Sequence, residues 1–119
     1  MTQTSNDGLN QIPSGLTAGQ VVKLGATAAY VPGSVVSRTL VKNAAGTITV
    51  FAFDAGQGLS EHTAKYDAVV QVLDGEVLLT IGGKEVSAGA GDIVLMPANV
   101  PHALHASKRF KMLLTMIRG

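Results

Sequence analysis

The chain has 119 residues, of which 46% are hydrophobic and 14% are charged, and its formal net charge at pH 7 is +1. This composition is typical of one compact domain and excludes a chain that is disordered throughout. The small net charge gives no electrostatic reason to expect nucleic acid or an acidic membrane surface as a partner.

The sequence contains no cysteine, which excludes disulfides, thiolate metal sites and a cysteine nucleophile. The first fifteen residues are polar and lack the apolar run of a secretory signal. No apolar stretch approaches the length that a transmembrane helix needs. We therefore expect a soluble, cytoplasmic protein that has no membrane partner.

The N-terminal third of the chain differs in composition from the remainder. Residues 1–15 are polar and predict a flexible arm, and residues 16–34 follow as a short helix and connector. Thr17 is followed three residues later by Gln20, which is the spacing of a helix capping box. This pattern predicts a short helix over about Ala18–Leu24.

From residue 35 onward, apolar segments rich in Val, Ile, Phe and Thr alternate with breaks that contain glycine. Many short strands with regular turns indicate a β-sandwich or a closed barrel, and no later segment has the 3.6-residue apolar period of a helix. We therefore predict one all-β domain over residues 35–119. The predicted strands are Val35–Lys42, Thr47–Asp54, Ala68–Leu73, Val77–Ile81, Ile93–Met96 and Phe110–Ile117.

The last predicted strand has apolar residues on both of its faces. Its more apolar face carries Phe110, Met112, Leu114 and Met116. The opposite face carries Lys111 and Thr115 but also Leu113 and Ile117. An apolar outer face on a small domain indicates a covering partner, so we expect a homodimer. The alternative is ordinary surface leucines, which need no partner.

The chain has three histidines, and two of them follow glycine turns. One stretch runs from Gly56 to His62 and another from Gly91 to His102, so each turn leads into a strand or loop that delivers one imidazole. His105 lies three residues after His102, which places it on the opposite strand face. We therefore interpret His105 as a surface or interface residue.

These two stretches resemble the paired motifs of the cupin family. In the first motif a glycine, two histidines, a glutamate and a second glycine follow one another at set spacings, and in the second a glycine, a proline, a glycine, a histidine and an asparagine do. The first motif falls on Gly56, His62, Ala64, Ala68 and Gly75, and the second falls on Gly91, Pro97, Asn99, His102 and Ala106.

The resemblance covers about residues 35–117. It is strongest to small single-domain cupins that carry Phe-Ala-Phe-Asp before the first motif, as Phe51–Asp54 does here. It implies a double-stranded β-helix, or jelly-roll barrel, with the short predicted helix at its N-terminus.

In metal-binding cupins the two histidines and the glutamate of the first motif and the histidine of the second hold the metal. The resemblance therefore places His62 and His102 at ligand positions and implies iron, manganese, nickel or zinc as the ion. Ala64 replaces the second histidine and Ala68 replaces the glutamate. Half of the ligand set is missing, including its only anion, so we expect a divalent metal to be held weakly at most.

Two further residues are candidates for the pocket. Asp67 precedes the missing glutamate position, and a strand slipped by one residue would turn its carboxylate inward; otherwise it is a turn residue bonded to backbone. Tyr66 either closes the pocket or packs on its rim. The residues Phe51, Phe53, Met96, Met112 and Met116 are typical of core, and one alternate set of them must line the interior.

Two functions fit these residues. The first is a barrel that binds a small polar molecule, or a weakly held divalent metal, without turnover. In a metal-free pocket the imidazoles would be hydrogen-bond partners or general acid and base groups. The second, which the resemblance implies, is a metal-dependent oxygenase, isomerase or decarboxylase that uses the metal as a Lewis acid. The missing ligands favour the first. Ser60 lies two residues before His62, on the same strand face, but no third group completes a hydrolase triad.

Overall fold

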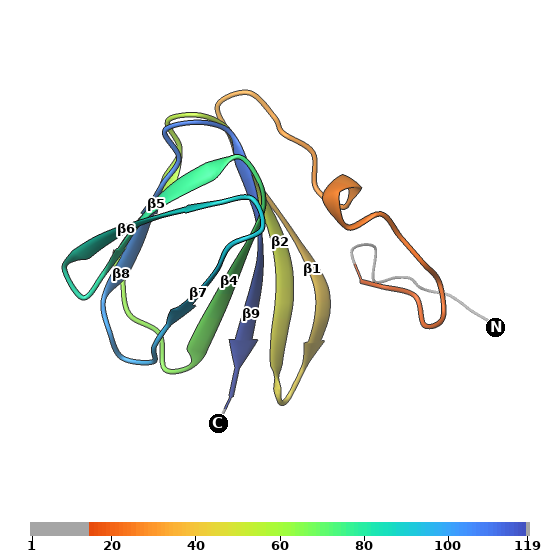
Figure 1. Ribbon diagram of the computed structural model, residues 1–119. Helices are drawn as coiled ribbons and strands as arrows, with labels where there is room; N and C mark the ends of the chain where they lie inside the picture. The colour runs from red at the N-terminus through yellow and green to blue at the C-terminus, as the bar shows by residue number, and fades with distance from the viewer. Residues whose placement is uncertain (1–14, 119) are drawn as a thin grey trace.

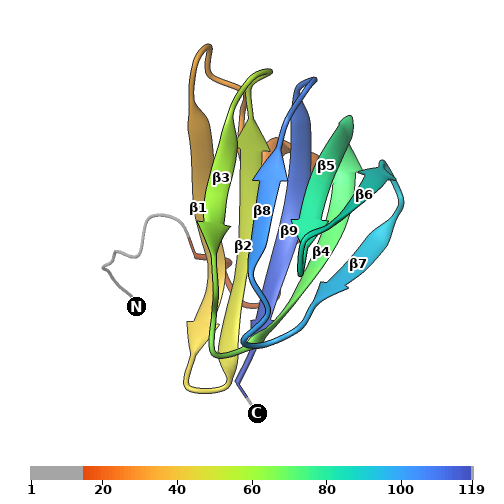
Figure 2. The same ribbon diagram turned by 90° about the vertical axis from the view of Figure 1, so that its left-hand side faces the viewer.

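The computed structural model describes residues 15–118, and within them nine β-strands form two antiparallel sheets that face each other (Figure 1). The five-stranded sheet has the order β1-β2-β9-β4-β7, and the four-stranded sheet has the order β3-β8-β5-β6 (Figure 2). The strands are β1 (Val35–Asn43), β2 (Gly46–Phe53), β3 (Gly58–His62), β4 (Asp67–Asp74), β5 (Glu76–Ile81), β6 (Lys84–Gly89), β7 (Ile93–Met96), β8 (His102–His105) and β9 (Phe110–Ile117). The predicted all-β, jelly-roll barrel is confirmed.

All six predicted strands are present, with boundaries that differ by one residue at most. Three strands, β3, β6 and β8, were not predicted. Their sequences, Gly-Leu-Ser-Glu-His, Lys-Glu-Val-Ser-Ala-Gly and His-Ala-Leu-His, are short and carry few apolar residues. Their pairing with apolar neighbours fixes them as strands, because strand propensity depends strongly on context.

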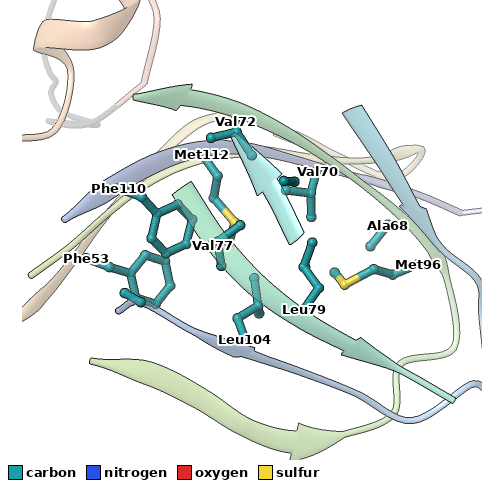
Figure 3. Packing of buried hydrophobic residues seen from close by; sticks show 12 residues of the cluster. Phe53, Ala68, Val70, Val72, Val77, Leu79, Met96, Leu104, Phe110 and Met112 are labelled. Atoms are coloured by element: carbon teal, nitrogen blue, oxygen red, sulfur yellow. The ribbon is translucent and has the colours of Figure 1, made fainter. Parts of the chain in front are cut away.

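The main core fills the space between the sheets (Figure 3). Phe53 of β2 and Phe110 of β9 stack at one end of it, with ring centroids 4.6 Å apart. Val70 of β4 and Leu79 of β5 face each other from opposite sheets and are fully buried. Alternate residues of β9 point into this core, as the sequence predicts.

A second apolar cluster lies on the outer face of the five-stranded sheet. Its buried members are Ala28, Leu40, Val50 and Ala52. The connector before β1 covers this part of the sheet, and Tyr30 fastens it by donating its hydroxyl hydrogen to Asp74 at 2.5 Å. Burial and this hydrogen bond raise the pKa of Tyr30.

Asp54, which ends the Phe-Ala-Phe-Asp segment, also holds the connector. Its carboxylate accepts hydrogen bonds from the backbone N–H of Gly33 at 2.7 Å and from Nε of Arg109 at 3.0 Å. The Gly33 N–H first, and Arg109 second, lower the pKa of this carboxyl group. The connector is therefore anchored to the barrel by polar contacts as well as by apolar burial.

The connector leaves some apolar residues of the outer face uncovered. Ile93 and Leu95 of β7 are 65% and 54% exposed, and Ile117 of β9 is 50% exposed. β7 and β9 belong to one sheet and are separated by β4. An apolar outer face of this kind is the feature from which we expect a homodimer. The dimer stays a prediction.

The predicted helix over Ala18–Leu24 is wrong. The structure has a 3₁₀ turn at Leu24–Ala26 instead. Gly19 has a positive φ of 77°, and the N–H of Gln20 bonds to the carbonyl of Thr17, so this segment forms a tight turn. A left-handed residue ends a helix rather than starting one, and it overrides the capping-box pattern.

Most of the predicted arm, residues 1–14, lies outside the described residues. Within residues 15–118, no helix has the length and hydrophobicity to cross a membrane. The cytoplasmic location stays a prediction.

Two hairpin glycines with similar backbone conformations offer a matched test of the packing. Gly75 has a φ of 72° and Gly83 a φ of 81°. A Cβ atom at Gly75 would overlap the carbonyl oxygen of Arg109, whereas none of the described atoms lies within 4 Å of a Cβ at Gly83. We expect Gly83→Ala to lower the free energy of unfolding by about 1–2 kcal/mol from backbone strain alone. Gly75→Ala should lower it by more than ~3 kcal/mol, because the strand must also move. Urea unfolding measures both, and equal losses would contradict the close approach.

Candidate functional site

A cavity of about 50 Å³ lies between the two sheets, and it contains both motif histidines in its lining. The alanines at the other two motif positions line it as well. The lining residues are Leu59, His62, Ala64, Ala68, Met96, His102, Leu104, Met112, Leu114 and Met116. Four of the predicted site residues are therefore brought together here, and Tyr66 and Asp67 lie outside the lining.

His102 is the buried partner of the histidine pair. It begins β8, is only 4% exposed, and lies between Ile81 of β5 and His62 of β3 in the strand register. Polar residues that are this buried are held by hydrogen bonds in native structures. Its ring therefore has a fixed place in the barrel.

His62 is brought to the same cavity by a β-bulge. Leu59 pairs with Leu104 and His62 pairs with His102, so three steps along β3 match two steps along β8. A bulge inserts one extra residue and changes which side chains face inward. Leu59 and His62 consequently share the inner face. Strict alternation predicts Ser60 on the same face as His62, and the bulge makes that prediction wrong.

The two imidazole rings lie edge to face, with centroids 4.4 Å apart and an interplanar angle of 68°. Nδ1 of His62 lies 2.9 Å from the carbonyl oxygen of Ser60, and Nδ1 of His102 lies 3.0 Å from that of Val100. A carbonyl oxygen can only accept, so each Nδ1 carries the proton and donates it. In the neutral form of each ring, Nε2 is then the nitrogen that carries the lone pair.

The loop before His102 is fastened to the loop before β4. Asn99 adopts a φ of 64°, and its N–H donates to the carbonyl of Ala64 at 2.7 Å. Asparagine tolerates this left-handed conformation better than most residues, so it can replace the glycine of the second motif. Asp67 adds a second bond, because its Oδ1 accepts from the N–H of Ala98 at 2.9 Å. This aspartate holds the loop, with its carboxylate bonded away from the cavity lining.

Tyr66 and His105 also take part in contacts away from the cavity. Tyr66 packs under the guanidinium of Arg118, which lies 5.0 Å from the ring centroid. His105 is exposed at the end of β8, opposite Gly58. Tyr66 therefore packs on the rim rather than closing the pocket.

The residues at this site match half of the cupin metal-binding set. His62 and His102 offer two neutral nitrogen donors, and Ala64 and Ala68 offer none. Within residues 15–118, no group of three or more His, Asp or Glu side chains is arranged to hold a metal ion. The four-ligand site of metal-binding cupins, with its carboxylate, does not fit this cavity.

Two methionines flank the position of the missing carboxylate. Ala68 of β4 pairs with Met96 of β7 on one side and with Met116 of β9 on the other. All three methionines within residues 15–118 line the cavity. From the sequence they are predicted to be core residues, because the strand order that places two of them beside Ala68 cannot be derived from local patterns.

Comparison with known proteins agrees with this architecture. The family model described as "Cupin domain" matches residues 49–117, which is more than half of the chain. No curated protein matches this sequence.

Several solved structures are similar. The conserved SPY1581 protein of unknown function from Streptococcus pyogenes is 32% identical, with a TM-score of 0.84, over 95% of this chain and 98% of that one. A cupin 2 conserved barrel domain protein from Leptotrichia buccalis is 36% identical, with a TM-score of 0.78, over 80% of this chain and 46% of that one. A predicted oxalate decarboxylase from Thermotoga maritima is 20% identical, with a TM-score of 0.65, over 70% of this chain and 79% of that one. At that identity the likeness shows the fold alone.

The hydrogen bonds of the two rings predict their tautomers. At about pH 8.5, where imidazole is neutral, we expect His62 and His102 of the metal-free protein to carry the proton on Nδ1. Two-bond ¹H–¹⁵N correlation spectra distinguish the tautomers, and the exposed His105 provides an internal reference. Protonation on Nε2 in either ring would contradict the assignment of the free lone pairs.

Proposed function

The chain belongs to the cupin family, and on that premise we propose that it is a metal-binding barrel in which His62 and His102 hold one transition-metal ion. One observation carries this proposal. Both rings donate Nδ1–H to a backbone carbonyl two residues earlier, which leaves both Nε2 lone pairs available in rings 4.4 Å apart.

This arrangement matches what metal-binding imidazoles require. Histidine ligands usually donate their other ring N–H to a carbonyl or carboxylate, which fixes the ring and raises its basicity. His62 and His102 both have such a partner before any ion arrives. The rotational entropy of the two rings is therefore largely lost on folding rather than on binding.

The size of the cavity favours an ion over an organic ligand. Pockets for drug-sized molecules measure roughly 300–1,000 Å³, and this one measures about 50 Å³. A water molecule needs roughly 10–15 Å³ of such space. The cavity therefore suits an ion together with a few molecules of the size of water.

The composition of the lining favours binding over turnover. Among the described residues that line the cavity, the imidazoles are the only groups that can exchange protons near neutral pH. General acid–base chemistry on a metal-bound substrate usually needs a further positioned group and room for the substrate. We therefore assign this barrel a binding role rather than an oxygenase, isomerase or decarboxylase activity.

Titration of tag-free, metal-free protein with Ni(II) or Zn(II) tests this function. We expect one ion per chain, with a dissociation constant of roughly micromolar or weaker because two neutral ligands hold it. His62→Ala and His102→Ala should each weaken binding at least ~10-fold, since a ligand is lost. His105→Ala is the matched control and should leave the affinity unchanged. An affinity that is unchanged in both the His62→Ala and the His102→Ala variant would contradict the proposal.

Restoring the missing side chains offers a test in the opposite direction. The double variant Ala64→His with Ala68→Glu supplies the two absent donors at positions that line the cavity. We expect its affinity for Mn(II) or Ni(II) to rise by about 100-fold or more, because an anionic ligand joins the site. Ala68 is 3% exposed, so the metal-free variant should be less stable than the parent and should regain stability with metal. An unchanged affinity in a folded double variant would place these positions away from the bound ion.

A further inference from the structure

We infer that the ion this cavity selects is a soft monovalent cation, Cu(I), held by the imidazoles of His62 and His102 and the thioethers of Met96 and Met116. This inference rests on the proposed function and specifies its ligand. It departs from the divalent ions that the family resemblance implies.

The register of three strands places the thioethers beside the histidines. Met96, Ala68 and Met116 are direct cross-strand neighbours on β7, β4 and β9, and all three line the cavity. Side chains that pair directly across strands share one face, with Cβ atoms roughly 4.5–5.5 Å apart. Figure 3 shows Met96 next to Ala68 in the interior. Ala68 has only a methyl group, so no long side chain stands between the two methionines at this position.

The type of donor selects the type of metal. Thioether sulfur is a soft ligand that favours Cu(I), whereas Mg(II), Ca(II) and Mn(II) prefer carboxylates, carbonyls and water. Imidazole nitrogen is compatible with copper in the same sphere. A cavity with two imidazoles, two thioethers and no carboxylate in its lining therefore matches a soft ion better than a hard one.

The charge of the ion points the same way. Each of the four donors is neutral, so the full charge of the ion remains in a cavity whose other walls include Leu59, Leu104 and Leu114. The cost of moving an ion from water into an apolar interior rises with the square of its charge in the Born description, and it is already large for one charge. The site borders solvent at the exposed His62, which lowers this cost for every ion, but in its apolar part a monovalent ion still enters at lower cost than a divalent one.

Methionine is also a common filler of irregular cores, and Met112 is assigned that role here. It pairs with Val72 and lies beside Phe110 in the aromatic half of the core (Figure 3). It is four residues before Met116 on β9, which is about 13 Å along an extended strand. Because Met112 also lines the cavity, the control is His105, which is exposed at the end of β8 and lies outside the lining.

Competition with a chromophoric Cu(I) chelator under anaerobic conditions tests the inference. We expect one Cu(I) per chain, bound at least ~100-fold more tightly than Zn(II) or Ni(II). Leucine keeps the size and hydrophobicity of methionine, so the variants should fold. The double variant Met96→Leu with Met116→Leu should lose at least ~10-fold in Cu(I) affinity, with Zn(II) affinity unchanged. His105→Ala should change neither value, and thermal unfolding checks that all variants fold.

A spectroscopic measurement separates coordination from indirect effects. X-ray absorption at the copper edge should show sulfur scattering in the parent and nitrogen scattering alone in the double variant. Cu(I) affinity unchanged in the double variant, or an absence of sulfur scattering in the parent, would overturn the thioether assignment. The proposed function survives those outcomes if Zn(II) or Ni(II) binding still depends on His62. If that dependence is also absent, the proposed function fails as well.

Discussion

The antiparallel pairing of β3 with β8 is the constraint on which the site depends. It sets His62 opposite His102, and the bulge before His62 brings its ring to the cavity lining, although the residue stays exposed to solvent. β3 is the edge strand of the four-stranded sheet, so only one neighbour holds it. The bonds from Asn99 to Ala64 and from Ala98 to Asp67 fasten the loops beside it. The precision of the site therefore comes from these few contacts, because edge strands are the least restrained part of a sheet.

The core divides into a filled half and a partly open half. Phe53 and Phe110 stack tightly in one, whereas alanines at the motif positions leave the cavity in the other. Protein interiors are normally packed as densely as organic crystals, so a cavity lined with polar nitrogen atoms requires an explanation. The ion that we propose would bind to the Nε2 lone pairs and would also fill this space. The two alanines at the motif positions depart from the family pattern, and they also make room for a ligand.

The sequence predicts the parts of this molecule that are encoded locally or by fixed spacing. Alternation identifies β9, and the motif spacing places His62 and His102 at one cavity. Features that depend on the partner strand are not predictable in this way. The bulge in β3, the polar strands β6 and β8, and the position of Met116 beside Ala68 arise from register across the sheet. The wrongly predicted N-terminal helix has another cause, because a single left-handed glycine outweighed the capping pattern.

The register of β4 keeps the nearest carboxylate out of the cavity, so the site has only neutral donors. Asp67 is the nearest residue in sequence to the missing glutamate, but it points away and bonds to the loop at Ala98. A slip of one residue along β4 would turn it inward, and it would also turn Ala68, Val70 and Val72 out of the core. All three are now buried, and a one-residue slip moves the whole inner set to the outer face. The loss of that burial is far larger than the gain from one carboxylate ligand. An anionic ligand can therefore be introduced at this site by substitution but not by rearrangement, and the barrel as it stands is restricted to neutral donors.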